Sequence, residues 1–174
     1  MTTTTTKTRT KKPTTTSKTN KKPAEKIQLT PSSRVDEIFS AVSSERIKTK
    51  KIEILRNYNE NFIKSVLIWN FDDSIISDLP PGEVPISPKE NADKSSSTNI
   101  RKEWSKFYNF VKGGNDAMSS LRKETMFINI LDTLHPKEAE ILILVKDKNL
   151  TNKYNITKEI VSEAYPDIQW GGRS

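Results

Sequence analysis

The hydrophobic pattern is most regular in residues 118–166. Apolar residues recur at helical intervals over 121–134, which predicts one amphipathic helix facing a core. The expected buried stripe comprises Leu121, Phe127, Ile128, Leu131 and Leu134. A proline is tolerated at the first position of a helix, so a second helix is expected to begin at Pro136. Its apolar run 141–145 is compatible with a buried helix or a buried strand; the proline start and the total length favour a helix.

Helical spacing also occurs elsewhere in the chain. Ser33, followed by Asp36 three residues later, resembles a capping box and predicts a short helix after it. Further helices are expected over about 45–58 and 60–70, over the aromatic-rich segment 100–111, and over 158–164, where Thr157 is a suitable cap. We therefore expect an all-α fold, an irregular bundle of about six or seven helices.

The segments between these helices suggest one domain over 31–170. Residues 79–98 form a proline-rich internal loop whose second half is polar and serine-rich. Residues 112–116 contain two glycines suited to a helix C-terminus, and residues 149–156 form a polar turn.

Charge is distributed unevenly. The chain carries +7, and residues 1–26 alone contain eight Lys or Arg against one acid, so residues 27–174 balance 21 basic with 21 acidic side chains. Residues 1–30 contain almost nothing apolar and are expected to be disordered. They form either a basic arm for nucleic acid or a solubilising or targeting tail. The expected phosphate contacts of the arm are Lys7, Arg9, Lys11, Lys12, Lys18, Lys21 and Lys22.

Several functional classes find no support in the sequence. There is no cysteine, no phosphate-binding P-loop and only one histidine, His135, which is most simply a helix-start residue. Asp72, Asp73 and Asp78 are more typical of capping groups than of a metal site. We expect no enzyme activity, no cofactor and no metal. The lack of a signal sequence or a long apolar run predicts an intracellular protein that does not span a membrane.

Two loops precede expected helices and could bind anions through free N–H groups. The first combines Lys112 with Arg122 and Lys123; the second carries Lys148, Lys153, Asn155, Thr157 and Lys158. An ordinary capped turn is an equal alternative for each. Aromatic and basic residues alternate in 100–111, but their helical spacing favours a core stripe over base stacking.

Three blocks, in this order, resemble the N-terminal helical DNA-binding domain of ATP-dependent DNA ligases, particularly those of bacteriophages. They are residues 50–67, residues 113–121 with the sequence GGNDAMSSL, and residues 134–166, which begin LHPKEAEIL and end ITKEIVSEAYP. The chain also resembles a group of small uncharacterised proteins encoded by large tailed phages. In that setting the compartment would be the host cytoplasm.

In the ligases this domain grips duplex DNA across the minor groove through backbone contacts. The resemblance implies DNA contacts at Gly114 and Asn115 in the first loop, and at Asn155, Thr157 and Lys158 in the second. Asn155 stands where a glycine is usual, and the second loop carries extra residues. No Lys-x-Asp-Gly adenylation motif follows, so catalysis is not implied.

The sequence therefore predicts a non-catalytic, largely sequence-independent DNA-binding protein of phage DNA metabolism, acting on duplex or nicked DNA. A phage or host replication or repair protein is a further expected partner. The alternatives are an adaptor that binds a host or phage protein, supported by the neutral body, and a virion-associated structural component.

Overall fold

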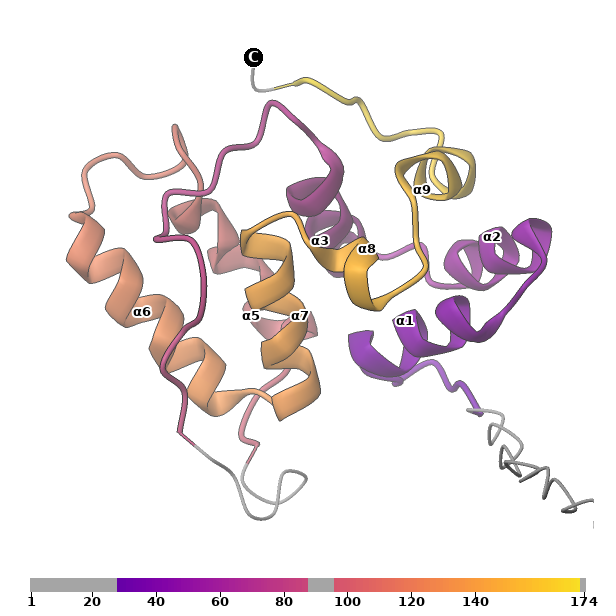
Figure 1. Cartoon of the computed structure of the whole chain (residues 1–174), viewed down its shortest axis with the longest axis horizontal. Coiled ribbons are helices and arrows are strands. Elements are labelled where there is room, and N and C mark those ends of the chain that lie inside the picture. Colours follow the sequence, from indigo (N-terminus) through magenta and orange to yellow (C-terminus); the bar gives the residue numbers. More distant parts are fainter. Residues whose placement is uncertain (1–27, 88–95, 173–174) are drawn as a thin grey trace, which may run out of the picture.

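The computed structural model describes residues 28–87 and 96–172. Within them the protein is an irregular bundle of α-helices, and an isolated bridge between Ser77 and Val111 is the only β-pairing (Figure 1). The elements are α1 (Val35–Ser44), α2 (Lys48–Asn57), α3 (Asn61–Phe71), α5 (Ile100–Glu103), the 3₁₀ helix η1 (Trp104–Phe110), α6 (Ser120–Thr133), α7 (Pro136–Lys146), α8 (Leu150–Lys153) and α9 (Lys158–Ala164). The expected all-α fold is confirmed.

Helix α7 is the centre of the bundle and contacts α1, α3, α6 and α8. It begins with Pro136 at its first position, and His135 caps it by accepting the Lys137 N–H at Nδ1, 3.2 Å away. The apolar run 141–145 is helical, so the choice of helix over strand was correct. Ile141, Leu142 and Val145 are fully buried because neighbouring helices cover this helix on several sides.

Helix α6 buries a different stripe from the one expected. Its buried residues are Phe127, Ile130, Leu131 and Lys123, whereas Leu121 is 73% exposed. Leu121 and Ile128, seven residues apart, lie on one flank of the helix. Ile128 is only partly buried and lines a hollow with Val84 and Pro85, whereas Leu121 does not line that hollow. The prediction of a buried Leu121 was wrong.

The aromatic segment 100–111 is not one α-helix. One α-helical turn, α5, passes into η1. A 3₁₀ helix aligns residues three apart, and this brings Phe107 and Phe110 together onto Trp69, with ring centroids 5.7 and 6.2 Å from the indole. Both phenylalanines are buried, which confirms the core role and not base stacking for them.

The cap of α1 differs from the sequence prediction, and the turn 149–156 contains a helix that was not expected. Ser33 does not cap α1. The N-cap is Arg34, whose N–H donates to the Glu37 carboxylate at 2.8 Å, while Ser33 Oγ accepts from the Thr30 N–H. The turn 149–156 contains α8 and buries Leu150, Tyr154 and Ile156. Thr157 caps α9 as expected and accepts from the Ile160 N–H.

The two expected irregular segments are only partly described. Thr30, assigned to the tail, is held by the Tyr58 O–H, which donates to its carbonyl at 2.7 Å. The proline-rich segment is fixed as far as Ser87, whose N–H donates to Asp132. Lys146 Nζ donates to the carbonyls of Pro80 and Gly82. All seven expected phosphate contacts of the tail lie outside the described residues. No described helix has the length and hydropathy to cross a membrane.

Candidate nucleic-acid interface

The first predicted loop is built around close backbone packing. Gly113 has φ 74°, as expected for a glycine that ends a helical segment. At Gly114 a Cβ atom would lie 1.7 Å from the Tyr108 carbonyl oxygen, so no larger residue fits without moving the backbone. The Asn115 side chain donates to Asn109 at 2.8 Å. Gly114 therefore allows the close backbone packing of this loop, and the Asn115 side chain is held by Asn109 without a ligand.

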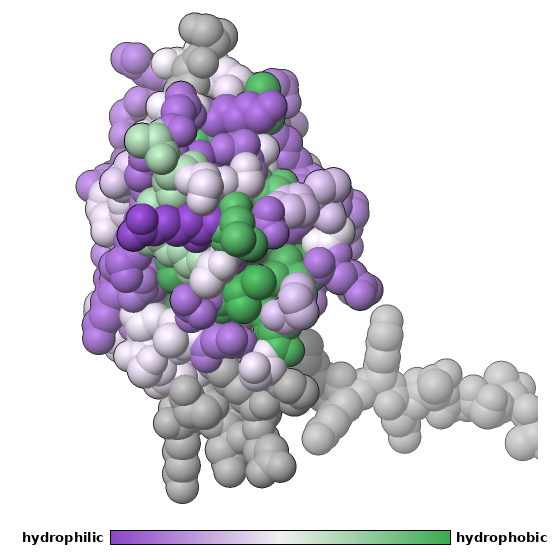
Figure 2. All heavy atoms as spheres, turned by 90° about the vertical axis from the view of Figure 1, so that its left-hand side faces the viewer, coloured by the Kyte–Doolittle hydropathy of each residue, from purple (hydrophilic) through white to green (hydrophobic). Residues whose placement is uncertain are grey.

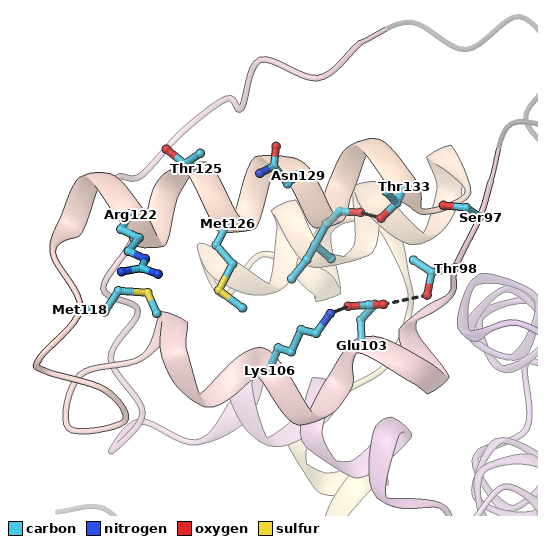
Figure 3. Close-up of a pocket in the computed structure, with 11 residues that line it drawn as sticks. Ser97, Thr98, Glu103, Lys106, Met118, Arg122, Thr125, Met126, Asn129 and Thr133 are labelled. Carbon is cyan, nitrogen blue, oxygen red and sulfur yellow. Dashed lines mark hydrogen bonds and ion pairs between the residues drawn. The ribbon is translucent and has the colours of Figure 1, made fainter.

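The two cations at the start of α6 have opposite environments. Lys123 is 1% exposed, and its Nζ lies 2.6 Å from the Asp78 carboxylate. A buried, paired ammonium cannot reach a phosphate, so we remove Lys123 from the predicted interface. The Arg122 guanidinium instead points into an open groove beside α6 (Figure 3). Lys112 is exposed on the loop itself.

Lys148 also has an internal role. Its Nζ donates to the Asp72 carbonyl at 2.5 Å and to the Trp69 carbonyl at 3.4 Å, and burial lowers its pKa. It is the one non-glycine residue with positive φ in 28–87 and 96–172, at 57°. The residue of the second loop with a left-handed conformation is therefore Lys148. It is not Asn155, although Asn155 stands at the position where the ligase domain usually has a glycine. We remove Lys148 from the direct contacts.

Asn155 contributes its backbone to the loop. Its N–H donates to Ser43 Oγ at 3.0 Å, and its carbonyl accepts from Lys51 Nζ at 2.6 Å. These bonds fasten the turn between α8 and α9 to α1 and α2. Thr157 is used as the cap of α9. The Asn155 backbone and the Thr157 hydroxyl are thus used within the protein, where they hold the helices together.

Beside this turn lies a hollow of about 380 Å³ that the sequence did not reveal. We call it the α1–α8 hollow. Lys153 is half-exposed at its edge and forms an ion pair with Glu140. Lys137 is exposed and makes no ion pair with any described residue. The hollow is lined by Ser40, Ser43, Ser44, Lys137, Lys153 and Tyr154.

The hollow offers groups that suit an oxyanion. Two lysines line one concavity together with three serines from the last turns of α1. Ser43 Oγ accepts from the Asn155 N–H and keeps its own hydroxyl proton for another acceptor. Ser44 donates to the Ala41 carbonyl and has lone pairs left. The arrangement can bind a phosphate by charge and hydrogen bonds.

The remaining predicted cation, Lys158, lies outside this hollow. Its Nζ is 4.0 Å from Asp73 and sits over the Trp170 ring, 5.0 Å from the centroid. Figure 1 places the two predicted loops at opposite sides of the bundle, the α6 loop at the left and the α8–α9 turn at the right. The structure therefore does not bring the two loops into one surface.

An unexpected ionisable group lies next to the hollow in sequence. Glu138 is 1% exposed, and its carboxylate accepts the N–H groups of Val35 at 3.2 Å and Ile100 at 3.3 Å. Burial raises its pKa to about 7, against the lowering effect of those two bonds. The sequence correctly placed Glu138 in the first turn of α7. It gave no signal that the first residues of α1 and α5 would lie next to the Glu138 carboxylate.

A family model spans most of the bundle, over residues 38–152, from the middle of α1 to α8. Its description reads "Family of unknown function (DUF6433)". The chain belongs to DUF6433. The DUF6433 region includes the three serines and Lys137 of the α1–α8 hollow, and it ends one residue before Lys153. No curated protein and no solved structure matches the chain. The likeness to the ligase domain stays a prediction from sequence.

Proposed function

We propose that this DUF6433 protein binds DNA through backbone phosphates, without sequence preference and without catalysing a reaction. The observation that carries the proposal is the charge distribution: the +7 of the chain equals the excess of basic residues in 1–26. Such a segment attracts a polyanion through counterion release, which needs no base contact. The body then needs only a docking point for one or two phosphates.

The α1–α8 hollow is the best docking point among the described residues. Lys137 makes no ion pair with a described residue there, and Lys153 can exchange Glu140 for a phosphate, because an exposed ion pair is worth only about 0–1 kcal/mol. The basic segment precedes α1 in the chain, and α1 is the helix that supplies the three serines. One strand of DNA held by the tail would therefore lie close to the hollow.

The proposed interface is smaller than the sequence suggested. It retains Lys153 and adds Lys137 with the serines of α1. Lys112 and Arg122 on one side and Lys158 on another are flanking contacts for a longer duplex. Gly114, Asn115, Asn155 and Thr157 keep indirect roles, since they set the loop geometry described above.

The test is fluorescence anisotropy of the full chain with intact duplex, nicked duplex and single-stranded DNA over a salt series. A full-length variant with the seven expected phosphate contacts of the tail changed to Gln should bind more weakly. The plot of log affinity against log salt should lose about 0.7–0.9 of slope for each contact removed. An unchanged slope would contradict a role for the tail. A truncated protein that starts at Ile27 then shows whether the helical body binds by itself.

Two charge-reversal pairs test the hollow with a matched control. Lys137→Glu with Lys153→Glu changes two lysines of the hollow, of which Lys153 pairs with an acid. Lys102→Glu with Lys106→Glu makes the same change on α5 and η1, since Lys106 pairs with Glu103. We expect the first pair to weaken binding at least tenfold more than the second. Equal effects would show that only net charge matters and that the hollow is not the docking point.

The adaptor alternative is favoured by a separate observation. The described body has an open groove of about 700 Å³ beside α6, and Leu121 is exposed at its end of the helix. If both lysine pairs leave DNA binding unchanged and the truncated protein does not bind, the body acts on protein and the DNA-binding role belongs to the tail alone.

A further inference from the structure

Helix α6 has an outward face that no described residue covers. Leu121, Arg122, Thr125 and Asn129 are exposed along it, and Leu121 is the most exposed large apolar side chain of the described body at 73%. Figure 2 looks onto this side of the molecule and shows apolar side chains gathered between polar ones. A helix face that mixes apolar and polar side chains in this way is suited to a reversible protein–protein contact.

A groove runs alongside this face, between α6 and the α5–η1 segment (Figure 3). The Met118 and Arg122 side chains lie at one end, near the start of α6, and Thr133 with Ser97 and Thr98 lies at the other. Met126 and Ile130 make the wall between them apolar. The cation at the first end is Arg122, which has no ion pair with a described residue, whereas Lys106 is neutralised by Glu103 at 2.6 Å.

The face of α6 is complementary to itself when reversed. Arg122 lies near its start and Asp132 near its end. In an antiparallel pair with the two-fold axis at the level of Phe127, residue 122 of one copy faces residue 132 of the other, and residue 125 faces residue 129. Both opposed pairs, arginine with aspartate and threonine with asparagine, are favourable. A parallel pair would instead place Arg122 against itself.

We propose that a second copy of this chain occupies the α6 face and groove, as a two-fold symmetric dimer with antiparallel α6 helices. In this arrangement Leu121 of one copy lies at one end of the contact, level with Thr133 of its partner. The 14 residues of α6 span roughly 21 Å, so the contact is short. A short contact of one helix and one groove predicts a weak dimer, with a Kd on the order of 10 µM.

The neutral body is consistent with self-association, because residues 27–174 carry as many acidic as basic side chains and two copies do not repel through it. The inference does not depend on DNA binding. Its tests use the full chain without DNA, so failure of either proposal leaves the other intact.

The first test is sedimentation equilibrium over a concentration series. Arg122→Asp and Asp132→Arg should each raise the dimer Kd about tenfold, and the double variant should restore it, because the opposed charges are then exchanged. Asp132 also accepts the Ser87 N–H, so Asp132→Arg additionally removes the hydrogen bond that holds the proline-rich segment to α6. Leu121→Ser should weaken the dimer as well. A wild-type protein that stays monomeric at about ten times the expected Kd overturns the proposal.

The second test uses the absence of cysteine from the chain. A Thr125→Cys protein mixed with an Asn129→Cys protein under a mild oxidant should give a disulfide-linked heterodimer faster than either variant alone gives a homodimer. Facing helices about 8–10 Å apart bring opposed Cα atoms within disulfide range, whereas residues 125 of both copies are offset along the helices. Equal rates for all three combinations would overturn the antiparallel arrangement. Partner proteins or peptides captured by a wild-type monomer would overturn it in favour of another occupant.

Discussion

Glu138 links the starts of three helices and makes the stability of this protein depend on pH near neutrality. It lies in the first turn of α7 and accepts the N–H groups of Val35 and Ile100, the first residues of α1 and α5. The charged groups that act on it are Asp36, which raises its pKa, and Arg34, which lowers it. Burial outweighs the hydrogen bonds, and the pKa rises from 4.5 to about 7.

The sign and size of the effect follow from this pKa. Between pH 4.5 and 7 the folded protein holds a proton on Glu138 that the unfolded chain has released, so the free energy of unfolding falls as pH rises. A difference of about 2.5 pKa units corresponds to roughly 3 kcal/mol at 1.36 kcal/mol per unit. This contribution is fully present below about pH 4.5 and lost above about pH 7.

Glu138→Gln removes the titration. The amide can accept only one of the two N–H groups, which costs about 1–3 kcal/mol independently of pH. The free energy of unfolding, from urea titrations followed by tryptophan fluorescence, should be measured for both proteins from about pH 5 to 8. The wild type minus variant difference should fall by about 2–3 kcal/mol over that range. Glu140→Gln, an exposed carboxylate on the same helix, is the control. A difference that stays level for Glu138→Gln, or rises with pH, would refute the reasoning.

Three further changes test the packing around the predicted interface. Gly114→Ala should lower the unfolding free energy by more than about 3 kcal/mol, since its Cβ would meet the Tyr108 carbonyl oxygen at 1.7 Å. The control Gly172→Ala, whose Cβ would make an ordinary contact at 3.6 Å, should lower it by less than about 1 kcal/mol. Equal shifts of the melting temperature would contradict this reasoning. Asp78→Ala should cost about 3–5 kcal/mol by leaving Lys123 buried without its carboxylate, as measured by urea unfolding. Asp167→Ala, which removes a carboxylate that is itself 62% exposed from its pair with Lys64, should cost about 1 kcal/mol or less. Tyr165→Phe removes a hydroxyl that donates to the Leu55 and Tyr58 carbonyls at 2.6 and 2.9 Å, so it should lower the unfolding free energy by about 1–3 kcal/mol; no change would mean that water replaces those bonds.

The sequence determined the local elements of this protein. Pro136 and the apolar residues after it specify where α7 begins and that its interior is buried, because proline and hydrophobic periodicity act within a few residues. Thr157 and Pro166 likewise bracket α9, and Gly113 marks a turn that needs positive φ. The unequal charge of residues 1–26 is a property of composition and needs no structure.

Only the tertiary structure decided which side chains are available to a partner. Lys123, Lys148 and Arg122 look equivalent in sequence, but the ammonium groups of the first two are held by the Asp78 carboxylate and the Asp72 carbonyl, and these partners are 45 and 76 residues away. Leu121 and Ile128 share a flank of α6, yet Leu121 is 73% exposed, whereas Ile128 is partly buried and lines a hollow with the proline-rich segment. The α1–α8 hollow gathers residues from 40 to 154. Periodicity reports which face of a helix is apolar, but burial and pairing depend on elements that are distant in the chain and adjacent only in the fold.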